Sequence, residues 1–360
     1  MALNEGSAPE VDLIIPVHTP TRPIERAVRS ALRSDASVRI TVVAHNTDPE
    51  PIAARLGALS SDRRVRILEF ADGIRSATGP FNFGLDQATG RFTSVMGSDD
   101  ELEPGAIASW LRLADRRNAA AVIPRQRHAS GGGVMTPVAR PLRTTGLDPV
   151  RDRLDYRSAP LGLVSRERFG ELRFAEGLRT GEDVSYVLRL WASGEEIAFD
   201  RRGPAYLVHD DAGDRITFTE APVRDDLEHI ERILDDPWFR GLPEPVRRAF
   251  ATKALRVSVF GAVHGRQNRD HWAPEDLASL RRIAERLIAA ADRPEGPLSR
   301  ADRNLLDAIL GPDADAARLR ALGEARRRFA SIDALIPRRI GRILDREAPL
   351  RFITASLFLR

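Results

Sequence analysis

Two adjacent aspartates follow directly on a short apolar stretch in the first third of the chain. Residues 92–96 (FTSVM) give way to Gly97, Ser98, Asp99 and Asp100. Carboxylates at the end of a strand can hold a divalent cation through oxygen ligands, and the cation can bridge phosphates. The alternative is a polar turn that caps the next helix, because Ser and Asp favour turns and N-caps. This stretch alone leaves both interpretations open.

Further polar clusters stand where other expected strands end or helices begin. Asn46 and Asp48 follow a second strand, Glu182 and Asp183 open a helix, and His209 follows a later strand. The carboxyl ends of parallel strands meet at one edge of a sheet, so we expect these clusters to lie together there. Each cluster also has a structural alternative: an Asx-turn, a charge that complements a helix dipole, or a packed histidine.

Strand and helix patterns alternate through residue 124 and position these clusters. Short β-branched runs alternate with segments of helical periodicity, which predicts an α/β fold with a mainly parallel sheet and flanking helices. Later strands and one helix extend this pattern to residue 208. The expected strands are 11–17, 38–44, 65–70, 92–96, 119–123, 161–165, 197–199 and 205–208, and the expected helices begin near 24, 51, 82, 106 and 182.

Helical spacing replaces this alternation from about residue 225 onward, and prolines separate the segments. We therefore expect a flexible N-terminus (1–10), an α/β domain (11–220) and an all-helical C-terminal domain (225–360). Residues 338–360 mix arginines with isoleucine, leucine and phenylalanine. A packed terminal helix is the expected form, and a basic amphipathic helix on an anionic membrane is the alternative. The C-terminal helices are also a candidate surface for homo-oligomerisation.

Composition excludes several classes of function. The 360 residues contain no cysteine, which excludes disulfides, thiolate metal sites and a cysteine nucleophile. Of the 55 basic residues only Lys253 is a lysine, the arginines are interleaved with acids, and aromatic residues make up 6%. Nucleic-acid binding would need a one-sided basic stripe with stacking aromatics, so no nucleic-acid partner is expected. No apolar run could span a bilayer and no signal peptide is visible, so we expect a cytoplasmic protein, with peripheral contact at the inner face of the plasma membrane as an option.

Four segments, in order, resemble the family 2 glycosyltransferases, which are inverting enzymes of the GT-A fold that use nucleotide-diphosphate sugars. The similarity runs from about Val11 to His209, and the order and spacing of the segments are more specific than any one of them. The segments are Leu13-Ile14-Ile15-Pro16-Val17-His18, Asp72-Gly73 with Asn82-Phe83-Gly84-Leu85 and residues 88–92, Ser98-Asp99-Asp100, and Gly181-Glu182-Asp183 with Arg189-Leu190-Trp191.

The resemblance implies a role for each matching residue. The nucleoside would be held by Pro16, Val17, His18, Asn46 and Asp48, with Asp72 near the base. Ser98 and Asp99 would approach the ribose or diphosphate. Asp100 would ligate Mn²⁺ or Mg²⁺, with Asp99 and His209 as further metal ligands, and Asp183, with Glu182, would be the general base. A metal would neutralise the leaving diphosphate, and a carboxylate would take the proton of the acceptor hydroxyl.

Three departures from the family pattern bear on the nucleotide. No acid follows the second strand directly, Phe81 stands where the family carries an arginine, and Gly97 stands where an aspartate is common. The expected function is transfer of a sugar, with a UDP-sugar as the expected donor, to a glycan, lipid-linked or polymer acceptor in bacterial glycan or cell-envelope synthesis. The alternatives are a catalytically silent GT-A-like scaffold and a nucleotidyltransferase. The second would need a glycine-rich loop after the first strand, and residues 16–23 contain no glycine.

Overall fold

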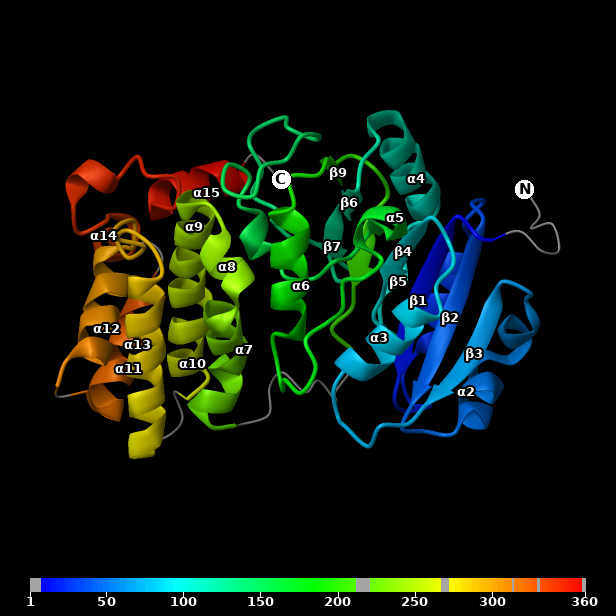
Figure 1. The fold of residues 1–360 in the computed structure, drawn as a ribbon, viewed down its shortest axis with the longest axis horizontal. Helices are drawn as coiled ribbons and strands as arrows, with labels where there is room; N and C mark the ends of the chain where they lie inside the picture. The colour runs from blue at the N-terminus through cyan, green and yellow to red at the C-terminus, as the bar shows by residue number, and fades with distance from the viewer. Residues whose placement is uncertain (1–7, 212–220, 267–271, 313, 329–330, 358–360) are drawn as a thin grey trace.

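The computed structural model describes residues 8–211, 221–266, 272–312, 314–328 and 331–357. A sheet with flanking helices occupies one side of the molecule and a bundle of helices occupies the other (Figure 1). The bundle begins after residue 220. The proposed boundary between the α/β and helical domains falls at residues 212–220, which lie outside the described part of the chain.

The main sheet has seven strands in the order β3-β2-β1-β4-β8-β6-β9. All neighbouring strands pair in parallel except β8, which is antiparallel to β4 and β6. The expected mainly parallel sheet is therefore confirmed, and the carboxyl ends of β1 to β4 share one edge. The strands are β1 (Val11–Val17), β2 (Val38–His45), β3 (Val65–Phe70), β4 (Phe92–Val95), β6 (Ala121–Pro124), β8 (Leu163–Ser165) and β9 (Ile197–Asp200).

A second, three-stranded sheet lies beyond the end of β4. It consists of β5 (Glu101–Leu102), β10 (Tyr206–Val208) and β7 (Gln126–His128), with β10 in the middle. The short strands β5 and β7 carry too little periodicity to be predicted from sequence. Pairing of β5 with β10 brings the chain after residue 205 beside the acidic turn.

Helices cover the main sheet, and most begin where the sequence predicts. One difference is α3, which begins at Thr78 instead of near residue 82. Pro80 lies in the first turn of α3, where its missing N–H is not needed for a helical hydrogen bond, so the helix can include it. The helices are α1 (Ile24–Leu32), α2 (Pro49–Leu56), α3 (Thr78–Asp86), α4 (Ala106–Arg117), α5 (Arg166–Phe169) and α6 (Glu182–Trp191), with 3₁₀ turns η1 (Gly57–Ser61) and η2 (Leu154–Tyr156).

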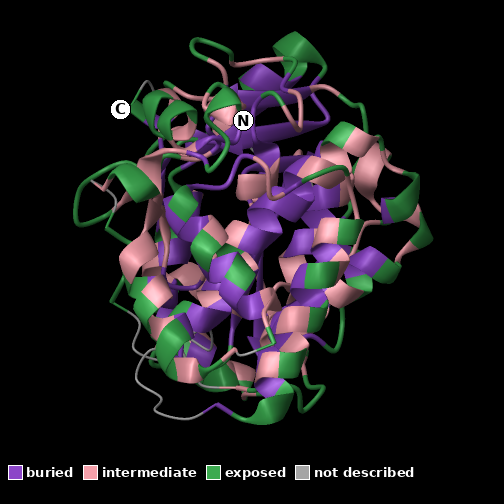
Figure 2. Cartoon of the chain, turned by 90° about the vertical axis from the view of Figure 1, so that its left-hand side faces the viewer, coloured by how far each residue is buried: buried purple, intermediate pink, exposed green. Residues whose placement is uncertain are grey.

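The C-terminal region is helical, as predicted, with buried apolar faces inside and polar faces outside (Figure 2). A single helix over 338–360 was wrong for the described residues, because a 3₁₀ turn comes first and Pro349 starts the last helix. The elements are α7 (Val223–Asp235), α8 (Pro237–Gly241), α9 (Glu244–Ala254), a π-helical turn (Leu255–Val259), α10 (Phe260–His264), α11 (Pro274–Ala289), α12 (Arg300–Leu310), α13 (Ala316–Arg326), α14 (Ile332–Leu335), η5 (Ile340–Arg342) and α15 (Pro349–Leu357).

Helix α6 belongs to two hydrophobic cores at once. Val184 and Leu188 pack into the core of the C-terminal helices. Val187 and Leu190, on another face of α6, pack into the core between the helix and the main sheet. Trp191 extends this second contact, and its indole N–H donates to the carbonyl of residue 157 at 3.0 Å. The position of α6 is therefore fixed from both sides (Figure 1).

Asp12 of β1 provides a test of how β1 is held to β2 and to the segment before β4. Its carboxylate is fully buried and accepts hydrogen bonds from Arg39 Nε at 2.6 Å and from the backbone N–H groups of Thr89 and Gly90 at 2.8 and 2.7 Å. Asp12→Ala leaves those donors without an acceptor, so we expect a loss of about 3 kcal/mol in the free energy of unfolding. Urea denaturation measures this loss.

The matched control is Asp62→Ala, which removes a carboxylate paired with Arg64 at 2.9 Å near the surface. Partly exposed pairs contribute about 0–1 kcal/mol, so this variant should be nearly as stable as the parent. If the two variants lost equal amounts of unfolding free energy, the role of Asp12 in holding β1 to its neighbours would be contradicted.

Candidate active site

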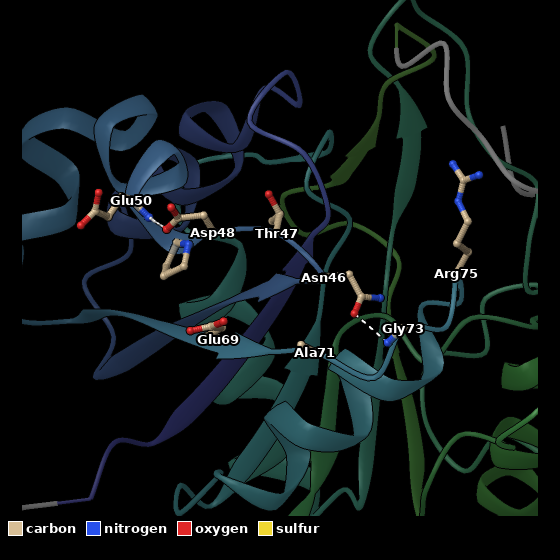
Figure 3. A pocket seen from close by; sticks show the side chains of 9 residues that line it. Asn46, Thr47, Asp48, Glu50, Glu69, Ala71, Gly73 and Arg75 are labelled. Carbon is tan, nitrogen blue, oxygen red and sulfur yellow. Dashed lines mark hydrogen bonds between the residues drawn. The ribbon is translucent and has the colours of Figure 1, made fainter.

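A cavity of about 740 Å³ lies beyond the carboxyl ends of β2 and β3. Figure 3 shows the side chains that line it, which come from the turn after β2, the start of α2, the end of β3 and the loop after β3. Six of the nine lining residues are polar or charged, which suits a ligand that carries several hydrogen-bonding groups. The lining residues are Asn46, Thr47, Asp48, Pro49, Glu50, Glu69, Ala71, Gly73 and Arg75.

Asn46 joins the two loops that border this cavity. Its backbone is in the left-handed region, with φ of 51°. Its side-chain oxygen accepts from the backbone N–H of Gly73 at 2.9 Å (Figure 3). The same oxygen accepts from the backbone N–H of Asp72 at 3.0 Å, and Nδ2 donates to the carbonyl of Ile74 at 3.1 Å. The structure therefore brings Asn46 and Asp72 together, as expected for residues at neighbouring strand ends.

His45 is a further polar residue at this edge, which sequence reasoning treated only as part of a turn. Its Nε2 lies 2.8 Å from Asp72 Oδ1, and its ring stacks on Phe70. Burial raises the pKa of Asp72, but hydrogen bonds from His45, Ile74 and Asn46 outweigh this and leave the pKa below its usual value. Asp72 is therefore held as a carboxylate.

The other residues expected around the nucleoside differ in their surroundings. Asp48 is the N-cap of α2, and its Oδ1 accepts from the backbone N–H of Glu50 at 2.9 Å (Figure 3). Asp48 therefore has a structural role, which was one of the two interpretations of this cluster. It also lines the cavity. At the end of β1, Pro16 is half-buried, Val17 is buried and His18 is exposed.

Two arginines of the β1–α1 region contact the acidic turn after β4. Arg22 Nη1 lies 3.0 Å from Asp99 Oδ2, and Arg26 donates to the backbone carbonyl of the same aspartate. Arg26 also pairs with Asp211 at 2.8 Å. Ser98 and Asp99 are both buried. Sequence reasoning did not single out these arginines, because only the folded chain brings α1 beside β4.

Asp100 is held in place by β10. Its Oδ2 accepts from the hydroxyl of Tyr206 at 2.6 Å, and its Oδ1 accepts from the backbone N–H of His209 at 3.1 Å. The carboxylate folds back over Gly97, where an added Cβ would lie 2.6 Å from Asp100 Oδ2. Gly97 therefore makes room for Asp100, and a third carboxylate at this position would displace it. The imidazole of His209 reaches Glu101, with Nε2 3.4 Å from Oε2.

The proposed metal ligands do not yet form a coordination site. Asp100 and His209 come together, and their carboxylate and imidazole groups suit Mn²⁺ or Mg²⁺ chemically. However, Asp99 is paired with Arg22. Within the described part of the chain, no three His, Asp or Glu side chains are grouped so as to hold a metal ion. In this conformation the residues do not fit a bound cation.

The N-terminus of α6 presents Glu182 and Asp183. Gly181 precedes them with φ of 76°, and the ring of His229 lies so close that a Cβ on Gly181 would be 2.5 Å from it. Burial, and then the charge of Glu182, raise the pKa of Asp183 to about 7. Burial also raises the pKa of Glu182. A carboxyl group with a pKa near neutrality can exchange a proton with a substrate hydroxyl.

Contacts between α3 and the segment before α6 connect this helix end to the sheet edge. The side chain of Asn82 donates to the carbonyl of Phe174 at 3.0 Å and accepts from its N–H at 2.9 Å. Phe174 also stacks on Phe81 and on Tyr186 of α6. The aromatic residue Phe81, noted above in the place of an arginine, therefore packs against the segment that leads to α6.

Comparison with known proteins identifies the family and the fold that this chain resembles. Residues 12–171 match the model of glycosyl transferase family 2. A succinoglycan biosynthesis protein, ExoO, of Rhizobium meliloti is 27% identical over 214 residues, 56% of this chain and 61% of that protein. The GalNAc(5)-diNAcBac-PP-undecaprenol beta-1,3-glucosyltransferase of Campylobacter jejuni is 26% identical over 108 residues, 30% of this chain and 35% of that protein. The chain thus spans less than two thirds of either curated relative.

Solved structures share the fold over most of the chain. TarS residues 1–349 of S. aureus, in complex with UDP-GlcNAc, superpose with a TM-score of 0.68 at 17% identity, covering 88% of this chain and 91% of that one. The complex of the same protein with UDP gives a TM-score of 0.66. A match of this length includes helices beyond the sheet. Residues 12–171 of the chain are therefore similar to glycosyl transferase family 2, and the chain has a GT-A fold followed by a helical region.

Proposed function

We propose that this protein is an inverting glycosyltransferase that moves a sugar from a UDP-sugar to an acceptor hydroxyl, with Asp183 as the general base. The observation that carries the proposal is the Asp183 carboxyl, at the N-terminus of α6 with a pKa of about 7. The match of residues 12–171 to the family model supports the reaction class. Pro16, Val17, His18 and Ser98 are proposed to line the donor.

The cavity beyond β2 and β3 is the proposed nucleoside site. Asn46 lines it, and its Nδ2 donates to the carboxylate of Asp72 at 3.1 Å, so these two side chains are the proposed hydrogen-bonding partners of the base. UDP is the proposed nucleotide, because the matching TarS structures contain UDP-GlcNAc and UDP. Arg22 and Arg26, beside Asp99, offer positive charge close to the proposed diphosphate position.

In the proposed reaction, the acceptor hydroxyl gives its proton to the Asp183 carboxylate as its oxygen attacks the anomeric carbon. The bond from that carbon to the diphosphate oxygen breaks, and UDP leaves with the electron pair. Displacement from the opposite side in one step inverts the anomeric configuration. Raised pKa values at Asp183 and Glu182 make α6 the place where this proton can be held.

The acceptor is proposed to be a glycan, a lipid-linked glycan or a polymer in bacterial polysaccharide synthesis. The names of the relatives support this, since one acts in succinoglycan biosynthesis and another transfers glucose to an undecaprenol-linked glycan. Mn²⁺ or Mg²⁺ is proposed as a cofactor at Asp100, Asp99 and His209, where it would neutralise the leaving diphosphate. Binding of the cation requires the Asp99 carboxylate to leave Arg22. The dependence on a metal is therefore tested separately from sugar transfer.

Nucleotide binding can be tested by thermal denaturation. We expect UDP to raise the melting temperature, because a ligand at 100 times its Kd adds about 2.7 kcal/mol of stability. Asp72→Ala should weaken this effect, and the surface variant Asp62→Ala should keep it. Repeating the titration with and without Mn²⁺ tests the metal. If neither UDP nor any other nucleoside diphosphate stabilises the protein under either condition, a non-catalytic scaffold is the better interpretation.

The role of Asp183 can be tested by the pH dependence of transfer, measured against a panel of nucleotide sugars. A base must be deprotonated to act, so kcat/KM should fall about tenfold per pH unit below pH 7. Asp183→Asn should lower kcat by at least about a hundredfold. A full rate in Asp183→Asn would overturn the assignment of the base.

The same carboxyl should make stability depend on pH with a defined sign. Its pKa is raised from 3.8 to about 7 on folding, so the folded protein binds this proton more tightly than the unfolded chain does. This contribution to stability is fully present below pH 3.8 and is lost as pH rises through 7. Asp183→Asn should therefore be more stable than the parent by about 1–3 kcal/mol at pH 8, and by less at pH 5, in urea titrations. A greater gain at pH 5 than at pH 8 would contradict it.

Peripheral membrane contact is proposed for the last described segment. No described helix is long and apolar enough to cross a membrane. Residues 332–357 nevertheless expose several large apolar side chains among arginines, the combination that binds an anionic lipid surface. The exposed apolar residues are Ile332, Ile340, Leu344, Leu350, Ile353 and Leu357.

Vesicle sedimentation checks this contact. We expect the protein to sediment with vesicles that contain phosphatidylglycerol and to stay in solution with phosphatidylcholine alone. Leu344→Ser with Ile340→Ser should reduce sedimentation several-fold without changing the melting temperature, because both side chains are exposed. If this pair instead alters the molar mass in light scattering, the surface joins two copies of the chain and the membrane proposal is wrong.

A further inference from the structure

One ion pair connects the turns that follow β1 and β4 at the edge of the main sheet. Arg22 stands in the turn between β1 and α1, and Asp99 stands in the turn after β4. Arg22 Nη1 lies 3.0 Å from Asp99 Oδ2, and each of the two side chains is 11% exposed. Little water reaches the pair, so its charges attract each other more strongly than they would at an open surface.

The order of the strands places this pair beside the path of the proposed nucleotide. In the order β3-β2-β1-β4, the cavity proposed for the nucleoside lies beyond β2 and β3, and the ion pair lies one step further along, beyond β1 and β4. Ligands of open α/β sheets bind outside the carboxyl ends of the strands. A nucleotide that runs along this edge from the cavity toward β4 would bring its diphosphate to Arg22 and Asp99.

The charges of the pair conflict with a diphosphate at this position. A diphosphate is an anion, so the carboxylate of Asp99 repels it. The guanidinium of Arg22, by contrast, can pair with phosphate oxygens as well as with a carboxylate, because both groups match its fork of N–H donors. Asp99 and the diphosphate are therefore competitors for the same guanidinium.

The second arginine of this region has a different task. Arg26 Nη1 and Nη2 reach the two carboxylate oxygens of Asp211 at 2.8 and 2.9 Å, and Nη2 also donates to the backbone carbonyl of Asp99. The hydrogen bonds with Asp211 raise the pKa of Arg26. Arg26 therefore holds the backbone of the turn after β4, whereas Arg22 contacts the carboxylate of Asp99.

We propose that Arg22 binds the diphosphate of the donor, and that this contact replaces the ion pair between Arg22 and Asp99. In the absence of a metal, the Asp99 carboxylate thus opposes donor binding. This inference rests on the proposed function in that the donor is taken to be a nucleotide-diphosphate sugar. It differs from a direct contact between Asp99 and the donor, because removal of the carboxylate charge should then strengthen binding instead of weakening it.

Isothermal titration calorimetry with UDP, in buffer that contains EDTA, provides the test. Asp99→Asn keeps the shape of the side chain but removes its charge, so the Kd for UDP should fall about fivefold. Arg22→Met should raise the Kd for UDP about tenfold and leave the Kd for uridine, which has no phosphate, unchanged. Arg22→Lys retains the charge and should recover part of the lost affinity.

Glu25→Gln is the matched control. Glu25 of α1 and Arg55 of α2 form an ion pair of the same 3.0 Å length, and this variant changes the net charge of the protein as Asp99→Asn does. Its Kd for UDP should stay at the parent value. The double variant Arg22→Met with Asp99→Asn completes a thermodynamic cycle. Relative to Arg22→Met alone, it should bind UDP less than about twofold more tightly. Circular dichroism shows whether each variant is folded.

The outcomes separate this inference from the proposed function. Weaker binding of UDP to Asp99→Asn means that Asp99 itself contacts the nucleotide, and equal binding means that the ion pair does not compete with it. Either result overturns the inference and leaves the proposed function intact. If no variant binds UDP, the titrations are repeated with pyrophosphate. Tighter binding of pyrophosphate to Asp99→Asn then supports the inference while the proposed nucleotide fails, and no binding of pyrophosphate overturns the inference as well.

Discussion

The packing of α6 between two cores is the constraint on which the rest of the site depends. One face of the helix is buried against the sheet and another against the C-terminal helices. A shift of α6 toward one of these cores would open a gap in the other. Its N-terminus carries Glu182 and Asp183. A proposed base on such a helix is held more firmly than one on a loop.

This placement has an electrostatic cost that the surrounding residues reduce only in part. Carboxylates at a helix N-terminus benefit from the backbone dipole, but burial outweighs that benefit and raises the pKa of both, and the charge of Glu182 raises the pKa of Asp183 further. Asp100 is treated differently, since a tyrosine hydroxyl and a backbone N–H satisfy it. Asp100 thus has its hydrogen-bond donors, whereas the pKa of Asp183 is raised by burial. Carboxyl groups with shifted pKa values are typical of functional sites.

The sequence predicts the parts of this structure that depend on local pattern. Strands β1 and β3 begin and end at the residues predicted for them. For β1 the reason is that a parallel strand buried on both faces is mostly apolar along its length. Residues brought in by tertiary contacts were not predicted. Tyr206 lies within the expected strand 205–208, and no local pattern shows that its hydroxyl meets Asp100. The terminal helix was misjudged because alternating arginines and apolar residues fit several short elements as well as one long helix.

The double burial of α6 also limits how this protein could be taken apart and recombined. A fragment that ended with the family-matched segment would leave out α6 itself, and one that ended after β10 would expose Val184 and Leu188 to water. Exchanging the helical bundle for that of a relative would have to reproduce the apolar surface on which α6 packs. The two halves are therefore not interchangeable modules, and a hybrid protein would have to inherit α6 together with both of the cores that it joins.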